Sequence, residues 1–537
     1  MSIYRVVVVL SLLLGVLPLS ASAMPGDTLK TLALTHRNPQ GLAFDGRHLW
    51  VADRLTDMFY KIDPADGRVI DSLPTPGYMV RGIAWDGTRL WCVDAEESRI
   101  YAVNPTTRVA EFTIYCPASN PEGLAWDGRY LWIADDAYDE IHQISPDDGT
   151  TIVAIKAPTA NPVGLAYDGA YLWVSDRMKD EIYMVHPKSG DVIVTFKAPG
   201  RHPWGLAWDG QALWCVDYET DRLYQIRVRD DAFFNRTDEK NEQVEFIHQV
   251  RNFGPDSIKT LDVYMAVPQD LNNQQLAGAP EFSPAPVGFL TDKWGQRVAH
   301  FRFTDLAASE FTNVTMNAQV KLYQNRYFIF PDKVSTLKDI PADIKQRYLI
   351  NDTKFDYDNE IIRSAVKAAV GDETNPYWIA RRIYNYLIEH LEYERVGGWN
   401  VAPAVLTRGN GSCSEYTFVY IAMCRAAGLP ARFVGSIVIR GDDASYDDVY
   451  HRWVEVYLPG YGWIPVDPSG GDSEWPATRA DFFGFIRNRY LITTAGGGGS
   501  EYLEWSYNAN ERWTSTGRCK IVVENFAEWS PVAPTTK

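Results

Sequence analysis

The residues of this chain that are best suited to chemistry are a cysteine, a histidine and an aspartate in its last third. Cys413 follows the small-residue run 409–412 and opens an apolar stretch whose spacing predicts a helix. The N-terminus of a helix carries partial positive charge and unpaired amide groups, which lower a thiol pKa from ~8.5 toward neutrality and can hold an oxyanion. Cys413 is therefore a candidate nucleophile.

His451 and Asp467 lie at the two ends of a predicted β-hairpin. Residues 451–457 and 462–467 alternate apolar and polar positions, with a Leu-Pro-Gly-Tyr turn between them. Pairing of the strands can bring the carboxylate to the imidazole and fix its tautomer, while the other ring nitrogen faces the thiol. We predict a catalytic triad of Cys413, His451 and Asp467. The alternative is a buried core thiol and a strand histidine without a catalytic role.

Four motifs in this region resemble the bacterial transglutaminase-like superfamily. They are Gly-x-Cys-Ser-Glu-Tyr at 411–416, Arg-Ala-Ala-Gly-Leu-Pro-Ala-Arg at 425–432, His-x-Trp-Val-Glu-Val at 451–456 and Gly-Trp-x-x-x-Asp at 462–467. The resemblance covers roughly residues 336–500 and implies an α+β, papain-like domain. It also implies that the cysteine, histidine and aspartate act as nucleophile, base and orienting residue. Members of the superfamily include transglutaminases, cysteine proteases and amidases.

The same resemblance implies a further oxyanion donor upstream of the nucleophile. The candidates are Tyr393, Trp399 and Asn400, and the alternative for the aromatic residues is a place in the core. His248 and His300 lack metal-ligand spacing. The sequence contains no phosphate loop, His-Glu-x-x-His motif or Cys-x-x-Cys pair, so we expect neither a cofactor nor a metal.

A repeat with a period of 41 residues organises the amino-terminal part of the chain. Each copy reads as four short strands, the first two joined by an Asp-Gly or similar turn, which is typical of a propeller blade. The fifth copy lacks its last strand, and residues 28–34, ahead of the first copy, have the character of that strand. We predict a five-bladed β-propeller over residues 24–231, similar to NHL-like propellers, with a linear solenoid as the alternative. The period is marked by Gly41, Gly82, Gly123, Gly164 and Gly205 and by Trp50, Trp91, Trp132, Trp173 and Trp214.

Aspartates also recur at the end of the second strand of every copy. We expect them to cap turns, and the alternative is a carboxylate ring that binds a cation. The recurring tryptophans are expected to pack between blades rather than to form a ligand cage. The aspartates are Asp53, Asp94, Asp135, Asp176 and Asp217.

Two further regions follow the repeats. Residues 232–335 alternate apolar and polar positions without helical spacing, which predicts a small β-sandwich. Residues 336–537 are assigned to the catalytic domain with a carboxyl-terminal extension, in which 496–499 reads as a mobile glycine loop and 520–523 as a final strand. The predicted fold is therefore multidomain: an all-β propeller, a β-sandwich and an α+β transglutaminase-like domain.

Composition bounds the setting in which the protein works. Residues 1–23 have one positive charge, an apolar core and Ala-Ser-Ala before Met24, as in a secretory signal peptide. No later stretch is apolar enough to span a membrane, so we expect an exported protein, periplasmic or extracellular. The formal net charge of −17 argues against nucleic acid or anionic lipid as a partner.

The cysteines are too few for a disulfide framework in a chain of 537 residues. Cys92 and Cys215 occupy equivalent positions in separate repeats, and Cys424 lies eleven residues beyond Cys413 on one predicted helix. Neither pair is expected to form a disulfide, and the candidate catalytic thiol is expected to be free.

These observations predict an exported, cysteine-dependent acyl-transfer enzyme. We expect it to act on amide bonds of a protein or peptide substrate through a thioester, with the propeller as a binding module for substrate or a protein partner. A cysteine peptidase or amidase is the alternative among enzymes. The alternative from another class is a binding protein in which the propeller recruits a partner and the transglutaminase-like domain is a scaffold.

Overall fold

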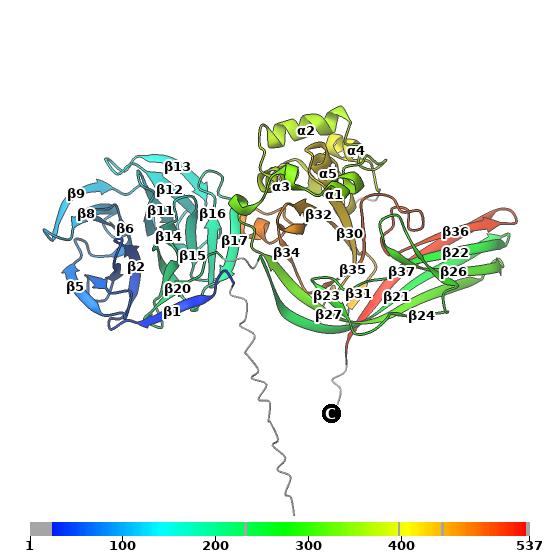
Figure 1. The fold of residues 1–537 in the computed structure, drawn as a ribbon, viewed down its shortest axis with the longest axis horizontal. Helices are drawn as coiled ribbons and strands as arrows, with labels where there is room; N and C mark the ends of the chain where they lie inside the picture. The colour runs from blue at the N-terminus through cyan, green and yellow to red at the C-terminus, as the bar shows by residue number, and fades with distance from the viewer. Residues whose placement is uncertain (1–23, 230–232, 396–397, 442–444, 533–537) are drawn as a thin grey trace, which may run out of the picture.

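The computed structural model describes residues 24–229, 233–395, 398–441 and 445–532, and the predicted signal peptide lies outside these residues. The repeats form five antiparallel sheets of four strands each (Figure 1). The first four sheets are β2–β5 (Pro39–Phe44, Leu49–Asp53, Met58–Ile62, Val69–Pro74), β6–β9 (Val80–Trp85, Leu90–Asp94, Arg99–Asn104, Val109–Tyr115), β10–β13 (Pro121–Trp126, Leu131–Asp135, Glu140–Ile144, Thr151–Lys156) and β14–β17 (Pro162–Tyr167, Leu172–Asp176, Glu181–Val185, Val192–Lys197).

The fifth sheet is completed by the start of the described chain. It contains β18–β20 (Pro203–Trp208, Leu213–Asp217, Arg222–Ile226) and, as its outer strand, β1 (Thr28–Ala33). β1 pairs antiparallel with β20, with Thr31 opposite Tyr224. The predicted pairing of residues 28–34 with the last repeat is thus confirmed.

The repeated glycines allow the first strands of neighbouring sheets to approach closely. These strands contact one another in the cyclic order β2, β6, β10, β14, β18 and again β2. A Cβ atom at Gly41 would collide with the carbonyl oxygen of Arg81, and one at Gly205 with the carbonyl oxygen of Gln40. Each glycine packs in this way on the next first strand, so the last sheet contacts the first.

The other repeated residues stabilise the individual sheets. Each repeated tryptophan is buried and donates its indole N–H to the aspartate of the preceding turn, as Trp50 does to Asp45 Oδ2 at 3.0 Å. The aspartates at the ends of the second strands accept backbone N–H groups of the following turn, as Asp53 does from Leu55 and Thr56 at 3.0 Å. Both expectations, blade packing and turn capping, are confirmed, and the described residues contain no cluster of acidic, histidine or cysteine side chains suited to a metal ion.

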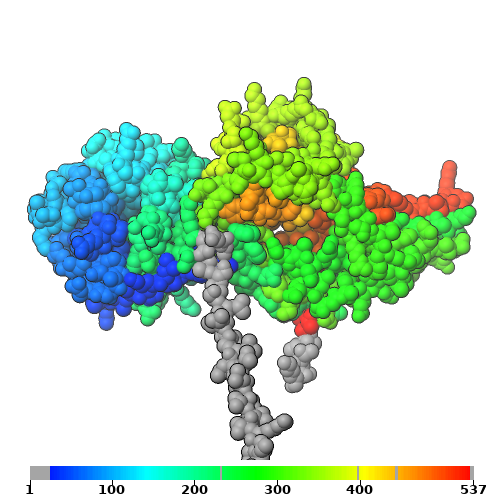
Figure 2. Space-filling model, viewed as in Figure 1, coloured from blue at the N-terminus to red at the C-terminus, as the bar shows by residue number. Residues whose placement is uncertain are grey.

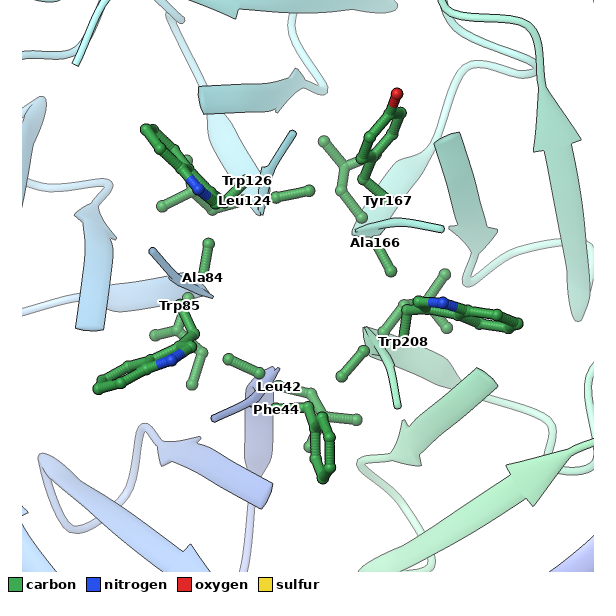
Figure 3. Close-up of a pocket in the computed structure, with 15 residues that line it drawn as sticks. Leu42, Phe44, Ala84, Trp85, Leu124, Trp126, Ala166, Tyr167 and Trp208 are labelled. Atoms are coloured by element: carbon green, nitrogen blue, oxygen red, sulfur yellow. The ribbon is translucent and has the colours of Figure 1, made fainter. Parts of the chain in front are cut away.

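The five first strands surround a channel of about 150 Å³ (Figure 3). Three consecutive residues of each strand line it, such as Leu42 to Phe44 and Leu124 to Trp126. In Figure 3 the labelled aromatic rings, among them Trp85 and Trp208, point away from the channel between the sheets. The channel wall is therefore made mainly of small and aliphatic groups.

Deleting residues 28–35 should lower the melting temperature of the repeat region by several degrees or more. The deletion removes Leu32, which is buried between sheets, and leaves β20 as an exposed edge. Thermal unfolding followed by circular dichroism checks this. Leu29→Ala, an exposed position of the same strand, is the control and should melt as the unmodified protein does. A deletion variant with unchanged melting would show that β1 is not needed to close the ring.

Two long sheets that share one core follow the repeats. One has the order β23-β27-β21-β37-β31, with β24 and β34 also paired to β27, and the other has the order β25-β26-β22-β36. Their facing side chains, among them Phe246, Val263, Phe301 and Trp529, form a single buried cluster. The strands are β21 (Phe234–Pro255), β22 (Ile258–Ala266), β23 (Gln274–Leu276), β24 (Glu281–Ser283), β25 (Gly288–Thr291), β26 (Arg297–Leu306), β27 (Phe311–Tyr327), β31 (Ser445–Asp447), β34 (Phe485–Ile486), β36 (Ala509–Ser515) and β37 (Cys519–Pro531).

The carboxyl-terminal strands correct one predicted assignment. The sequence analysis places residues 509–531 in an extension of the catalytic domain, but β37 pairs along β21 and β36 pairs with β22. Ala527 and Trp529 bury their side chains in the core of the two long sheets. Pairing over such sequence distances depends on tertiary packing, so alternation alone predicts the strand but not its partner.

The candidate catalytic region is a four-stranded sheet, β33-β32-β30-β35, covered by helices. The strands are β30 (Ala431–Val438), β32 (His451–Leu458), β33 (Gly462–Val466) and β35 (Tyr490–Gly496). The central helix α5 (Cys413–Ala426) contacts β30, β32 and three other helices. The helices are α1 (Ala342–Tyr348), α2 (Glu360–Val370), α3 (Pro376–His390), α4 (Ala402–Arg408) and α6 (Pro476–Ala480), with 3₁₀ turns at Pro331–Lys333 and Leu337–Asp339.

The glycine run 496–499 is packed, so the prediction of a mobile loop is wrong. Arg425 Nη2 donates to the carbonyl oxygen of Gly497 at 2.6 Å, and Gly499 N donates to Asp352 Oδ2 at 3.1 Å. A Cβ atom at Gly497 would lie 2.6 Å from the ring of Trp294. The run is rich in glycine because an indole lies against its backbone, not because the segment is a linker.

The catalytic region docks on the repeat region (Figures 1 and 2). Arg381 of α3 is 1% exposed and lies 3.2 Å from Asp191 Oδ1, to which Asn385 also donates. Ala477 and Ala480 of α6 join the buried cluster between the third and fourth sheets. In Figure 2 the blue-to-cyan repeat lobe lies directly against the lobe coloured green to orange. None of the described helices is long and apolar enough to span a membrane.

Candidate active site

Cys413 is the first residue of α5, as predicted. Ser412 precedes it as the N-cap and forms a capping box with Glu415, whose Oε2 accepts the N–H of Ser412 at 3.1 Å. The rest of the helix is enclosed, since residues 414–425 are all buried, whereas Cys413 itself is partly exposed. The fold thus presents a thiol at the N-terminus of a rigid helix.

His451 and Asp467 are brought together by the predicted hairpin, which the structure confirms. β32 and β33 pair antiparallel from Val454 opposite Val466 to Leu458 opposite Gly462, so His451 begins one strand and Asp467 follows the other. His451 Nε2 lies 2.6 Å from Asp467 Oδ2. The remaining ring nitrogen is free to face Cys413, with which the imidazole also interacts.

The carboxylate of Asp467 is itself held in place. Its Oδ1 accepts the hydroxyl of Ser469 at 2.7 Å and the N–H groups of Ser469 and Gly470 at 3.2 Å. One oxygen is therefore fixed by the loop after β33 while the other contacts the imidazole. This arrangement orients the ring of His451.

The electrostatics of the three side chains favour a thiolate and an imidazolium. Burial alone would raise the pKa of the Cys413 thiol, but the hydrogen bonding and charge of His451 and the N–H of Arg452 lower it below its ordinary value. Burial alone would lower the pKa of His451, but the charge of Asp467 and its hydrogen bond, together with Cys413, raise it well above its ordinary value. Burial would raise the pKa of Asp467, and the charge of His451 lowers it. The proton therefore resides on the imidazole.

The three candidate oxyanion donors differ in their surroundings. Asn400 donates its side-chain amide to Glu415 Oε1 at 3.1 Å, so that donor is already engaged. Tyr393 is 41% exposed on the short strand β28 (Glu392–Tyr393), which pairs with β29 (Asn410–Gly411). Trp399 is 40% exposed, and its ring lies 5.0 Å from the guanidinium of Arg452. Trp399 and Tyr393 thus remain available as donors, together with the backbone N–H groups at the start of α5.

Sequence reasoning missed the residues that enclose the site from distant parts of the chain. Tyr490 stacks on His451 at 5.7 Å, and Tyr507 lies 4.3 Å from the guanidinium of Arg452. Arg452 points away from His451, as strand alternation predicts. No local motif marks Tyr490 or Tyr507, because their partners are dozens of residues away.

A small cavity of about 30 Å³ adjoins the imidazole and carboxylate, and aromatic side chains, among them Trp453 and Phe482, line it. Asp481, Phe485 and Arg487 also line a second cavity of about 640 Å³, whose far wall includes Thr195 and Lys197 of β17. The site therefore communicates with a space between the catalytic region and the fourth sheet of the repeats.

Residues 363–468 match the family model of the transglutaminase-like superfamily. The chain contains a transglutaminase-like domain. The matched range includes Cys413, His451 and Asp467. The resemblance that the local motifs indicate is thus confirmed.

Individual relatives are distant. An uncharacterised protein of Haemophilus influenzae is 27% identical over 153 residues, which cover 24% of this chain and 42% of that protein, so the match spans less than half of the curated relative. A solved structure described as a candidate cysteine protease of Cytophaga hutchinsonii has 13% identity and a TM-score of 0.40, covering 56% of this chain and all of that one. The glutaminyl cyclase of Myxococcus xanthus has 15% identity and a TM-score of 0.35, covering 38% of this chain and all of its own.

Iodoacetamide should modify Cys413 much faster than Cys424 near neutral pH. Cys424 is fully buried and its pKa is raised by burial, whereas Cys413 is partly exposed with a lowered pKa. The rate at Cys413 should fall as the pH drops through its lowered pKa, because protonation removes the thiolate. Mass spectrometry of timed digests measures both rates. Equal rates in the folded protein would remove Cys413 as the nucleophile.

Proposed function

We propose that the protein is an exported, cysteine-dependent acyl-transfer enzyme that acts on amide bonds of protein or peptide substrates. The observation that carries this proposal is the series Cys413, His451 and Asp467, with a 2.6 Å contact between the last two and the thiol at the N-terminus of a buried helix. Nucleophile, base and orienting carboxylate are the parts that thiol acyl transfer requires.

The chemistry proceeds in two steps. The thiolate of Cys413 attacks the amide carbonyl carbon and forms a C–S bond, and the oxyanion is held by N–H groups at the start of α5. Collapse breaks the C–N bond, and His451 gives its proton to the departing amine. Water or a second amine then attacks the thioester, His451 takes its proton, and the thiolate leaves.

Hydrolysis is the expected main outcome, because no tunnel for a deprotonated amine is evident in the sequence and water is abundant outside the cytoplasm. The test is incubation of the enzyme with a glutamine-containing peptide and a labelled primary amine at millimolar concentration. Released acid should exceed amine conjugate. An excess of conjugate would make the protein a transglutaminase proper, and cleavage of the peptide backbone instead would favour the peptidase alternative. The Cys413→Ala variant is the control for both products.

We further propose that the five sheets are the blades of a closed five-bladed β-propeller that contributes to substrate binding. Support comes from the cyclic contacts of the repeated glycines and from the 640 Å³ cavity that joins β17 to the site. Lys197→Ala, on the cavity wall, should raise KM for a protein substrate and leave kcat unchanged. Arg108→Ala, on the second sheet, is the matched control. Unchanged KM in both variants would argue against a role for this propeller face.

Export is proposed from the composition of residues 1–23. The mature protein should then begin at Met24 and be found outside the cytoplasm. N-terminal mass spectrometry of the protein from fractionated cells measures this. A cytoplasmic protein that retains residues 1–23 would contradict the proposal.

A further inference from the structure

Arg452 is a fully buried cation one residue beyond His451. Its exposed fraction is 0%. Four aromatic rings from separate elements enclose the guanidinium, so it lies in an apolar box rather than at the surface. The rings belong to Tyr507, Phe433, Trp399 and Phe418, at 4.3, 4.8, 5.0 and 5.3 Å from the guanidinium carbon.

The guanidinium has few polar partners. Nη2 donates to the carbonyl oxygen of Trp505. Nε and Nη1 have no hydrogen-bond acceptor, and no carboxylate pairs with the group, among the residues that the structure describes. Burying an unpaired charge is costly, so an anion close to this box would be strongly stabilised.

The other charged groups around the box are already compensated. The buried carboxylate of Glu415 accepts from Arg408 Nη2 at 2.9 Å and from Asn400, and Lys354 adds a positive charge by donating to the carbonyl oxygen of Trp399. Tyr507 stays neutral because burial raises its pKa. The remaining ion pairs are Asp447 with Arg440 at 2.8 Å and Asp467 with His451 at 2.6 Å.

The sulfur of Cys413 is the remaining candidate counter-ion. With a proton on His451, the imidazolium and Asp467 neutralise each other, which leaves the thiolate and the guanidinium as two uncompensated opposite charges. The backbone N–H of Arg452 reaches the sulfur, and the charges of Cys413 and Arg452 attract each other. Although burial lowers the pKa of Arg452 to about 10, the side chain is charged at neutral pH.

We propose that Arg452 is a positioning residue that holds Cys413 as a thiolate, serving as its counter-ion from within the aromatic box. This inference rests on the proposed function, in which Cys413 is the nucleophile. It assigns a role to a side chain that points away from the imidazole and that none of the triad contacts requires.

The pH dependence of Cys413 alkylation by iodoacetamide tests the proposal without any substrate. Arg452→Met should move the midpoint of the profile up by about one pH unit or more, equivalent to a tenfold or larger loss of thiolate at low pH. Arg425→Met is the matched control, because Arg425 is an equally enclosed arginine at the other end of α5 that donates to Ile350, Ala431 and Gly497. It should leave the midpoint in place. An unmoved midpoint in folded Arg452→Met would overturn the proposal.

Stability provides a second measurement, should Arg452→Met fail to fold. Removing the thiolate leaves the guanidinium without its counter-ion, so Cys413→Ala should melt below the unmodified protein. Where Arg452→Met folds, the double variant should lose less than the sum of the two single losses. Equal or higher melting of Cys413→Ala, or additive losses, would contradict the pairing. Because neither measurement uses amide turnover, an inactive enzyme with a coupled Cys413 and Arg452 would refute only the proposed function.

Discussion

Cys413→Ala should lose amide turnover by about 10⁵-fold or more, the largest effect of any substitution in this chain. Without the sulfur no thioester can form, and removal of the nucleophile from a related serine triad costs ~10⁶-fold in kcat. The variant should keep its fold, since Cys413 is partly exposed at a helix end. Steady-state assays with a glutamine-containing peptide, together with circular dichroism, measure both properties.

Cys424→Ala is the matched control for the cysteine variant. Cys424 lies on the same helix, fully buried in the core, and takes no part in the site. It should lose some stability through the small cavity created and retain its turnover. If the two variants were equally active, Cys413 would have no role in the reaction.

Asp467→Asn should lower kcat by up to about 10⁴-fold while leaving the fold intact. An amide in place of the carboxylate no longer fixes the imidazole tautomer or stabilises the imidazolium, and the equivalent change in a serine triad costs ~10⁴-fold. Loss of the negative charge also removes the main cause that raises the pKa of His451. The imidazolium should therefore deprotonate at lower pH, and the alkaline limb of the activity profile should move down.

The control for this variant is Asp481→Asn. Asp481 lines the same cavity but pairs with Arg326 at 2.9 Å rather than with the histidine. It should change kcat by less than a few-fold, since exposed ion pairs contribute little. Equal activity of Asp467→Asn and the unmodified protein would remove Asp467 from the mechanism.

The site could be predicted from sequence because its determinants are local. A helix start, a capping box and a four-residue turn fix where Cys413, His451 and Asp467 lie, and each is written within a few neighbouring residues. The repeat region was predictable for a related reason, since its glycine and tryptophan positions recur in every copy.

Contacts between distant segments could not be predicted in this way. β37 joins β21 through pairs such as His248 with Asn525, which are 277 residues apart. Tyr507 approaches Arg452 from the segment before β36 and leaves no pattern in the sequence around the strand. Such contacts depend on which apolar surfaces meet after the elements form, and alternation or helical spacing does not encode that choice.

The most direct test of the account is the mass of the enzyme during turnover. The protein is mixed with a glutamine-containing peptide, quenched in acid within milliseconds to seconds, and examined intact and after digestion. The account predicts a mass increase equal to the peptide less one ammonia, located on Cys413, sensitive to hydroxylamine and absent from Cys413→Ala. Turnover without any adduct on Cys413, or the same adduct in Cys413→Ala, would contradict a thioester at this cysteine.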